Sequence, residues 1–184
     1  MARPIVLKGK KVSLGVLERT DVPLMYAGFN LPEVRRYLKR PERVQTLEDA
    51  YQLYDSSRTD EGSVTFALSV NTPRGEKKTG SDLAGIISLS HVSVTNRTAE
   101  LEYVILRDYW EKGYASEGVS LAAAHAFSMM NLRKLVARVY GPNIASVRVL
   151  EKNGFREAVR LKRHVFVDGE YADELLFELE RPGQ

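Results

Sequence analysis

The sequence contains no cysteine among its 184 residues. That absence excludes a disulfide scaffold, a thiolate zinc site and a cysteine nucleophile. The three histidines, His91, His125 and His164, lie too far apart to match the spacing of metal-ligand motifs. We therefore expect no metal, either structural or catalytic.

Long hydrophobic runs are missing as well. No stretch approaches the roughly 18 uninterrupted apolar residues of a membrane-spanning helix, and residues 1–4 lack the apolar core of a signal peptide. We therefore expect a cytoplasmic protein that does not contact a membrane. A chain of this length with 43% apolar residues can bury one sizeable core, which favours a single domain over residues 1–184.

Neither sign of charge dominates, since 27 basic residues stand against 24 acidic ones. The formal net charge of +3 suits a phosphate-bearing cofactor, an acidic protein surface or nucleic acid. The basic residues are dispersed, however, and the sequence shows no helix-turn-helix pattern and no basic tract interleaved with aromatic residues. Nucleic acid is therefore a weak candidate partner, and charge alone selects no function.

The order of hydrophobic patterns is that of a mixed α and β protein. Period-two alternation and apolar runs predict strands at residues 12–18, 64–70, 83–94, 99–106 and 134–140. Helical spacing predicts helices from residue 21, at 46–57, at 113–130 and at 143–153. The chain closes with a predicted hairpin of residues 155–167 and 171–179, which turns at Asp168 and Gly169. Residues 71–82 are expected to form a turn-rich connection.

Capping residues support three of these helix starts. Asp21 is a candidate N-cap for the first helix, which has Pro23 in its first turn. Thr46 and Asp49 have the spacing of a capping box. Asn143 is a candidate N-cap for the last helix.

The segment before the longest predicted helix has the features of a phosphate-binding turn. An apolar strand is followed by the polar loop 107–112, and then Gly113, Tyr114 and Ala115 begin the helix. The first turn of a helix leaves backbone N–H groups unpaired and carries partial positive charge. Small residues at positions 113 and 115 let a pyrophosphate approach these groups. A ligand that carries a diphosphate therefore fits, although small residues at a helix start are often only structural.

Several motifs around this turn occur in an order typical of one family. Residues 110–117 read WEKGYASE and contain the pattern x-x-Gly-x-Gly/Ala. Residues 83–87, residues 99–103, the Asn-to-Gly-Phe segment 143–155 and residues 167–173 complete the set. Together they resemble the GNAT superfamily of acetyl-CoA-dependent N-acetyltransferases. The most similar branch is the RimJ/RimL type, which acetylates the N-termini of proteins, including ribosomal proteins.

The resemblance implies both a fold and a cosubstrate. The implied fold is an α/β (α+β) domain, in which helices flank a mixed, mostly antiparallel sheet whose fourth and fifth strands splay apart. Acetyl-CoA would lie with its pantetheine arm in the splay and its pyrophosphate on the turn at Gly113. The residues expected to bind it are Tyr103, Val104, Ile105, Lys112, Gly113, Tyr114, Ala115, Ser116 and Asn143.

The chain departs from the family pattern at three positions. Glu111 stands where the branch usually has glycine, and a carboxylate there would repel a pyrophosphate unless it points to solvent. Trp110 stands where other GNAT enzymes have glutamine or arginine. Leu150 occupies the position of the tyrosine that many GNAT enzymes use as a general acid, so that acid is absent.

Three residues are candidates for catalysis. Glu100 and Glu102 lie two residues apart on a predicted strand, so both side chains point to one face, where either could accept a proton from an amine. Ser146 stands where relatives in the N-terminal branch use serine to protonate the departing thiolate. The alternatives are that the two glutamates are solvated surface charges and that Ser146 only supports the helix start near Asn143.

The acceptor is expected to be a primary amine that attacks the thioester directly in a ternary complex. A model α-amine, with a pKa of about 7.7–8.0, is roughly one-tenth neutral at pH 7, whereas about one lysine in several thousand is neutral. This favours a protein N-terminus. A polyamine, an aminoglycoside or an amino acid stays open as an alternative acceptor, as does a non-catalytic CoA-binding module. A homodimer is one option for the assembly.

Two further residues have weaker functional interpretations. His91 lies among alternating apolar neighbours and is expected to be a strand residue rather than a base. Asp173 could recognise a substrate amine, but an ion pair within the closing hairpin is the simpler interpretation.

Overall fold

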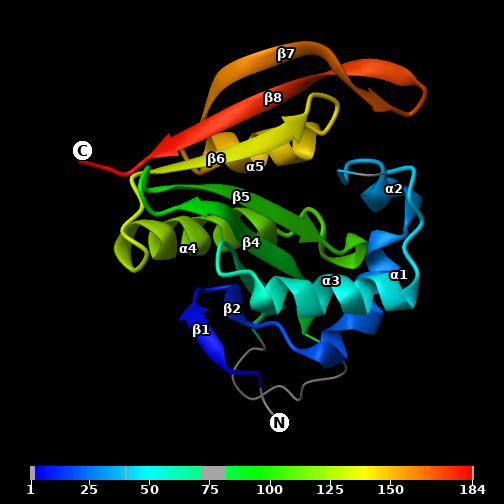
Figure 1. The fold of residues 1–184 in the computed structure, drawn as a ribbon, viewed down its shortest axis with the longest axis horizontal. Helices are drawn as coiled ribbons and strands as arrows, with labels where there is room; N and C mark the ends of the chain where they lie inside the picture. Colours follow the sequence, from blue (N-terminus) through cyan, green and yellow to red (C-terminus); the bar gives the residue numbers. More distant parts are fainter. Residues whose placement is uncertain (1–2, 40, 72–81, 184) are drawn as a thin grey trace.

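The structure is a computed structural model that describes residues 3–39, 41–71 and 82–183. Within these residues one eight-stranded sheet has the order β1-β2-β3-β4-β5-β6-β8-β7 (Figure 1). The strands are β1 Ile5–Lys8, β2 Val12–Val16, β3 Val64–Val70, β4 Leu83–Ser93, β5 Thr98–Ile105, β6 Lys134–Tyr140, β7 Arg156–Val167 and β8 Glu170–Glu180. The helices are η1 Arg19–Asp21, α1 Val22–Phe29, α2 Pro32–Arg35, α3 Leu47–Thr59, η2 Arg107–Tyr109, α4 Tyr114–Ser128 and α5 Ile144–Lys152.

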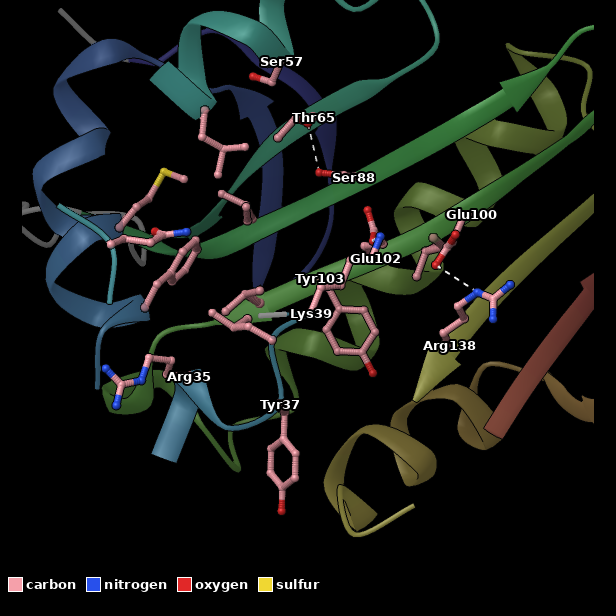
Figure 2. Close-up of a pocket in the computed structure, with 18 of the residues that line it drawn as sticks. Arg35, Tyr37, Lys39, Ser57, Thr65, Ser88, Glu100, Glu102, Tyr103 and Arg138 are labelled. Carbon is pink, nitrogen blue, oxygen red and sulfur yellow. Dashed lines mark hydrogen bonds and ion pairs between the residues drawn. The ribbon is translucent and has the colours of Figure 1, made fainter. Parts of the chain in front are cut away.

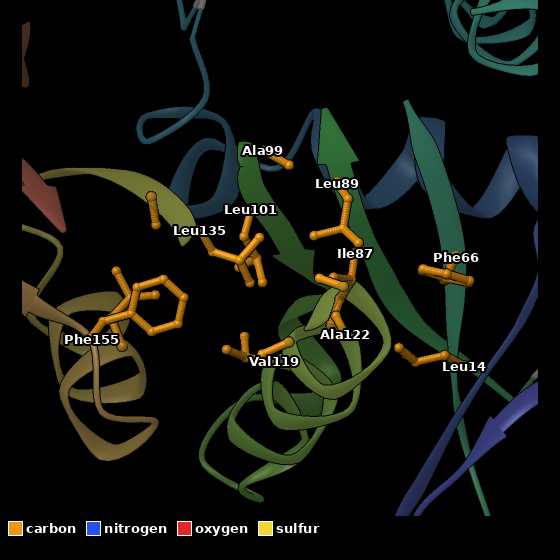
Figure 3. Close-up of a cluster of buried hydrophobic side chains, with 14 of the residues drawn as sticks. Leu14, Phe66, Ile87, Leu89, Ala99, Leu101, Val119, Ala122, Leu135 and Phe155 are labelled. Carbon is orange, nitrogen blue, oxygen red and sulfur yellow. The ribbon is translucent and has the colours of Figure 1, made fainter. Parts of the chain in front are cut away.

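Helices cover both faces of the sheet, because alternate strand residues point to opposite sides. Phe66 and Leu68 of β3 pack in one hydrophobic cluster with α4, while Ala67 between them packs in a second cluster with α1 and α3. Figure 3 shows the first cluster, in which Val119 and Ala122 of α4 lie beneath the central strands. Both residues are fully buried. The sheet is therefore the middle layer of three.

The sheet is antiparallel throughout except where β5 meets β6. These two strands are parallel and pair at only three positions, the last of which joins Glu100 to Val136. Beyond that pair β5 continues to Ile105 and β6 to Tyr140 without a shared ladder, so the two strands splay apart. The predicted mixed, mostly antiparallel sheet with a splay is confirmed. The strands counted as fourth and fifth in the family are β5 and β6 here.

The sequence patterns placed most elements within two residues of their observed bounds. The capping box is confirmed, since the Thr46 hydroxyl accepts from Asp49 N while the Asp49 carboxylate accepts from Thr46 N. The closing turn is also confirmed, with Asp168 and Gly169 at φ +51° and +89°. The predicted connection 71–82 lies almost wholly outside the described residues.

Two predictions near the N-terminus need correction. The first predicted strand ends at Val16 rather than at residue 18, and β1, which was not predicted, pairs with it. Asp21 occupies the N-cap position of α1, but its side chain does not cap that helix. Its carboxylate instead forms an ion pair with Arg3, at 2.5 Å, and accepts from Glu18 N. A buried carboxylate gains more from a guanidinium than from one backbone N–H.

Among the described residues, no helix is both long and apolar enough to cross a membrane.

Candidate active site

The splay between β5 and β6 opens into a cavity of about 770 Å³. One wall consists of β5, β6 and the start of α5, and the opposite wall comes from α1, α3 and the segments 35–39 and 43–45. Figure 2 shows this cavity with Glu100, Glu102 and Tyr103 projecting from the same strand. Residues that are about a hundred positions apart in sequence therefore share one site.

The two strand carboxylates lie on one face, as the period-two spacing predicted, and both line the cavity. Glu100 is the more buried, with its side chain 15% exposed against 35% for Glu102. Glu100 contacts Arg138 Nε at 3.8 Å and His91 Nδ1 at 3.5 Å. Glu102 forms an ion pair with Lys39 and accepts a hydrogen bond from the Ser90 hydroxyl at 3.0 Å. Glu102 therefore faces a basic side chain from the opposite wall, and Glu100 faces one from the neighbouring strand.

The charge of Lys39 depends on its place in the cavity. Burial lowers the pKa of the Lys39 ammonium, but the hydrogen bond to Glu102 and the charges of Glu102 and Glu100 outweigh that effect, so the net pKa is raised. Lys39 is consequently a cation at neutral pH. The cavity thus contains fixed charges of both signs.

Tyr103 and Ser146 form a hydroxyl pair on the side of the cavity next to α5. The two hydroxyl oxygens lie 2.7 Å apart, and Tyr103 Oη also lies 3.3 Å from the Ser146 carbonyl oxygen. Burial raises the pKa of Tyr103 to about 12, against a lowering by the hydrogen bond with Ser146. Tyr103 is therefore a neutral donor throughout the physiological range.

Asn143 and Leu150 flank Ser146 on the same helix. The Asn143 side chain caps α5 by accepting from Ser146 N at 3.2 Å, so its structural interpretation is confirmed, and it also lines the cavity. Leu150 is fully buried in the hydrophobic core. The position at which many GNAT enzymes carry a tyrosine acid is thus filled with an apolar side chain.

The backbone of β5 divides its polar groups between two edges. Leu106 N donates to Ala84 O, and because hydrogen-bonded pairs alternate along an antiparallel ladder, Val104 turns its main chain toward β4. The main-chain groups of Tyr103 and Ile105 then face the splayed edge. The Ile105 carbonyl accepts from Trp110 Nε1 at 2.8 Å, which places the indole across the end of the strand.

The turn before α4 has the geometry that a phosphate site requires. Gly113 is the N-cap in the left-handed region, at φ +78° and ψ +8°, and no side chain in the described part of the protein caps the helix there. The first-turn N–H groups of α4 therefore lie at a free helix start. Glu111 also has a positive φ, +60°, which explains why glycine is usual at this position, and its side chain is exposed to solvent. The carboxylate need not face a phosphate.

Two lysines lie near this turn. Lys112 Nζ donates to Asp108 O at 2.7 Å and lies over the Tyr109 ring, so its charge stabilises the loop itself. Lys11 Nζ, from the β1–β2 hairpin, lies 3.3 Å from Lys112 O and 3.6 Å from the position that a Cβ would take at Gly113. Lys11 therefore brings a positive charge to the predicted pyrophosphate position.

Glu117 holds that hairpin against the helix. Its carboxylate accepts from Lys10 N and, at 3.1 Å, from Lys11 N. A side chain at Gly9 would overlap the same carboxylate. The contact between Glu117 and the hairpin therefore fixes the backbone position of Lys11 beside the start of α4.

The remaining predicted cofactor residues lie in the first turn of α4. Tyr114, Ala115 and Ser116 are each partly exposed there. Ser116 Oγ accepts from Asn153 Nδ2 at 3.2 Å, which ties α4 to the end of α5. An open helix start, a left-handed glycine and a splayed strand edge together fit the pyrophosphate and the arm of coenzyme A.

The weaker candidates have structural partners. Asp173 pairs with Arg160 at 3.5 Å and Lys162 at 3.0 Å and accepts from Arg163 N, all within the β7–β8 hairpin. The hydrogen bonds that the Asp173 carboxylate accepts from Arg163 N and from Lys162 lower the pKa of Asp173. His91 lies at a bulge of β4 with φ +50°, is 71% exposed, and reaches Glu100 from outside the cavity.

Sequence reasoning missed several side chains that line or border the site. Lys39, Arg138 and Glu174 line the cavity, and Lys11 lies at the helix start. Lys39 and Lys11 lie in loops that carry no motif, so no signal in the sequence marked them. Arg138 and Glu174 are polar residues in otherwise apolar strands, and that polarity was the available signal.

Comparison with known proteins agrees with this geometry. The chain matches the family model described as an acetyltransferase (GNAT) domain over residues 12–156. Spermidine N(1)-acetyltransferase of Escherichia coli strain K12 is 28% identical over 182 residues, which cover 94% of this chain and 92% of that protein. The chain belongs to the GNAT family and is an acetyl-CoA-dependent N-acetyltransferase.

Solved structures share the fold. Spermidine N-acetyltransferase from Vibrio cholerae, in complex with CoA and spermine, has a TM-score of 0.81 at 22% identity and covers 94% of this chain and 96% of its own. RimL, a ribosomal L7/L12 alpha-N-protein acetyltransferase in complex with coenzyme A, has a TM-score of 0.82 at 16% identity and covers 98% of this chain and 99% of its own. At these identities the likeness shows the fold and leaves the acceptor open.

Proposed function

We propose that this enzyme acetylates a small primary amine in the cavity between β5, β6 and the segments 35–39 and 43–45. The observation that carries the proposal is that this cavity is bridged at its outer side. Tyr37 Oη donates to Pro142 O at 3.4 Å, and Arg36 Nη1 pairs with Asp168 Oδ2 at 3.2 Å. These contacts join the α2 segment to α5 and to the β7–β8 turn, so the cavity is better matched to a small molecule than to a long chain.

The likeness to spermidine acetyltransferases supports a small acceptor as well. The Escherichia coli relative is 28% identical to this chain over 182 residues, whereas the likeness to RimL, at 16% identity, supports a shared fold alone. A protein N-terminus, as in the RimJ/RimL-type branch, is the second candidate. The ordinary pKa of an α-amine favours a protein N-terminus, because such an amine is already partly neutral, and so able to attack, at pH 7.

On the acceptor side, Glu100 and Glu102 are the groups that can take the amine proton. Both carboxylates line the cavity on the face where the amine would enter. Glu102 is held in place by its ion pair with Lys39 and its hydrogen bond from Ser90, while Glu100 has only the longer contacts to Arg138 and His91, at 3.8 and 3.5 Å. We propose Glu102 as the closer base, since it lies past the last β5–β6 pair where the strands have parted.

On the leaving-group side, Ser146 donates a hydrogen bond to the departing sulfur and Tyr103 positions Ser146. The Ser146 hydroxyl has one hydrogen. If Tyr103 donates to Ser146 Oγ across their 2.7 Å contact, that hydrogen is free to point into the cavity. Polarisation by the tyrosine also strengthens the serine as a donor. This pair takes the place of the acid that is absent at Leu150.

The cofactor supplies the acetyl thioester when bound. The main-chain groups of Tyr103 and Ile105 on the splayed edge are proposed to hold its pantetheine arm, with Val104 between them. The N–H groups of residues 113–116 and the ammonium of Lys11 are proposed to hold its phosphates. Lys112 contributes by shaping the loop, and Asn143 by fixing the start of α5.

A product screen tests the acceptor class. Acetyl-CoA would be incubated with equimolar polyamines, aminoglycosides, amino acids and N-terminal peptides, and acetylated products would be identified by mass spectrometry. We expect a small amine to be the main product with wild-type protein, and a loss of about 100-fold or more in Glu100→Gln/Glu102→Gln protein. A peptide acetylated at its α-nitrogen ahead of every small amine would favour the second candidate, and no acetylated amine at all would contradict both.

A further inference from the structure

The charges that line the acceptor cavity are balanced. Among the described residues, four basic side chains face it, Arg35, Lys39, Arg43 and Arg138, together with four acidic ones, Asp49, Glu100, Glu102 and Glu174. A cavity selective for a polyvalent cation needs an excess of carboxylates, because like charges repel the ligand. The balance therefore does not suit a polyamine and requires another explanation.

Arg138 is the basic side chain at the splay itself. Glu100 and Val136 form the last β5–β6 pair, so Glu102 and Arg138 are the next positions on the same face of their strands, where the strands part. Figure 2 shows Arg138 opposite the carboxylates of β5, with its ion pair to Glu100 dashed. An acceptor whose amine is near Glu102 would have its neighbouring group near Arg138.

The guanidinium of Arg138 has unused donors. Its contacts to Glu100 and Glu174 are both 3.8 Å long, beyond hydrogen-bond range. Among the described residues, its side chain makes no hydrogen bond. It is 46% exposed, so these donors can reach a ligand. A guanidinium that is held loosely between two carboxylates can accept a planar or tetrahedral anion in a bidentate manner.

We propose that the acceptor is a primary amine that also carries an anionic group, a carboxylate or a phosphate. The amine lies at Glu100 and Glu102, and the anion lies at Arg138, with Lys39 adding positive charge from the opposite wall. Such an acceptor brings no net positive charge beside Lys39 and Arg138, whereas a polyamine brings several. This inference rests on the proposed function, since it concerns the acceptor of the same reaction.

Matched acceptors test this inference directly. The pairs would differ only in the anion, for example an α-amino acid against its amide and phosphoethanolamine against ethanolamine, with spermidine as the cationic reference. We expect kcat/KM to be at least about tenfold higher for the anionic member of one pair. A preference within the amino acid and amide pair would show recognition of a carboxylate, and a preference within the phosphoethanolamine and ethanolamine pair would show recognition of a phosphate. Calorimetry with CoA present should show the same order of binding.

Two variants separate the role of Arg138 from a general effect of charge. Arg138→Gln should abolish the preference, because it should lower kcat/KM of the anionic member at least about tenfold more than kcat/KM of the neutral member. Arg43→Gln removes one positive charge from the same cavity, but Arg43 is already held by Asp49 at 2.7 Å, so the preference should persist. Lys39→Met should raise the relative rate with spermidine.

The outcomes distinguish this inference from the proposed function. Equal rates within both pairs, a preference that survives Arg138→Gln, or spermidine as the best wild-type acceptor would each overturn the anion inference while small-amine acetylation stands. Absence of acetylation and of calorimetric binding for every amine would overturn both.

Discussion

The hydroxyl oxygens of Tyr103 and Ser146 lie 2.7 Å apart, although the residues are 43 positions apart in sequence and belong to β5 and α5. The contact joins the strand whose edge faces the splay to the helix whose first turn borders it. It is the structural reason to expect that the two residues act together rather than separately.

Removal of either hydroxyl should slow the chemical step. We expect Ser146→Ala to lower kcat by about 10- to 100-fold and Tyr103→Phe by about 10-fold, because the tyrosine acts through the serine. The double variant should be no slower than Ser146→Ala, and the Kd for acetyl-CoA should change by less than about twofold in all three. Additive effects on kcat would show that the hydroxyls act independently.

The pH dependence of kcat should show no contribution from Tyr103 in the ordinary range. Burial raises its pKa to about 12, so the phenol stays protonated and able to donate below about pH 11. A decrease of kcat between pH 8 and 10 should therefore be identical in wild-type and Tyr103→Phe proteins. Disappearance of such a decrease in the variant would place the tyrosine pKa lower than the buried environment implies.

The phosphate-binding turn should be sensitive to side chains at Gly113. Its φ of +78° strains any β-branched residue, and the added methyl groups would occupy the pyrophosphate position. We expect Gly113→Val to raise the Kd for acetyl-CoA by at least about 100-fold, measured by calorimetry. Gly169→Val is the matched control, because Gly169 has a similar φ of +89° with open space around it and lies in the β7–β8 turn, not at the start of α4. Comparable affinity of the two variants for acetyl-CoA would contradict the assignment of the turn at Gly113 as the pyrophosphate site.

Lys11 should contribute to cofactor affinity through its charge. We expect Lys11→Met to weaken acetyl-CoA binding by about fivefold at low salt, with a smaller difference at high salt, because exposed charges are screened. Lys8→Met alters an exposed lysine of the same hairpin and should leave the Kd unchanged. Equal effects of the two variants would indicate a general electrostatic attraction rather than a contact at the helix start.

The Arg3–Asp21 pair should matter for stability because both side chains are largely buried, at 10% and 7% exposure. Asp21→Ala leaves the guanidinium with only a long contact to Asp82, at 3.9 Å, and a hydrogen bond to Val16 O, and should lower the free energy of unfolding by about 3 kcal/mol. Asp55→Ala removes the exposed partner of Arg19 and should lower the free energy of unfolding much less, because water screens an exposed pair. Urea unfolding measures both, and equal losses would contradict the burial argument.

The sequence by itself determined the order of elements and the chemistry of the turn before α4. Period-two and helical patterns are local, so β3, β6 and the helices at residues 114–128 and 144–152 were predicted within two residues. Gly113 and Asn143 have the backbone roles that their residue types require, a left-handed start and a side-chain cap. The common face of Glu100 and Glu102 likewise follows from strand geometry alone.

Only the tertiary structure decided what those residues face. The three-residue β5–β6 ladder ends at Glu100, and that end places Glu102 across from Arg138 and Tyr103 against Ser146. Lys39 and Lys11 reach the site from loops whose local sequence has no pattern, because their positions follow from packing of α2 on the sheet and from Glu117 holding the β1–β2 turn. Asp21 was assigned to the wrong partner for the same reason, since Arg3 becomes its neighbour only when β1 pairs with β2.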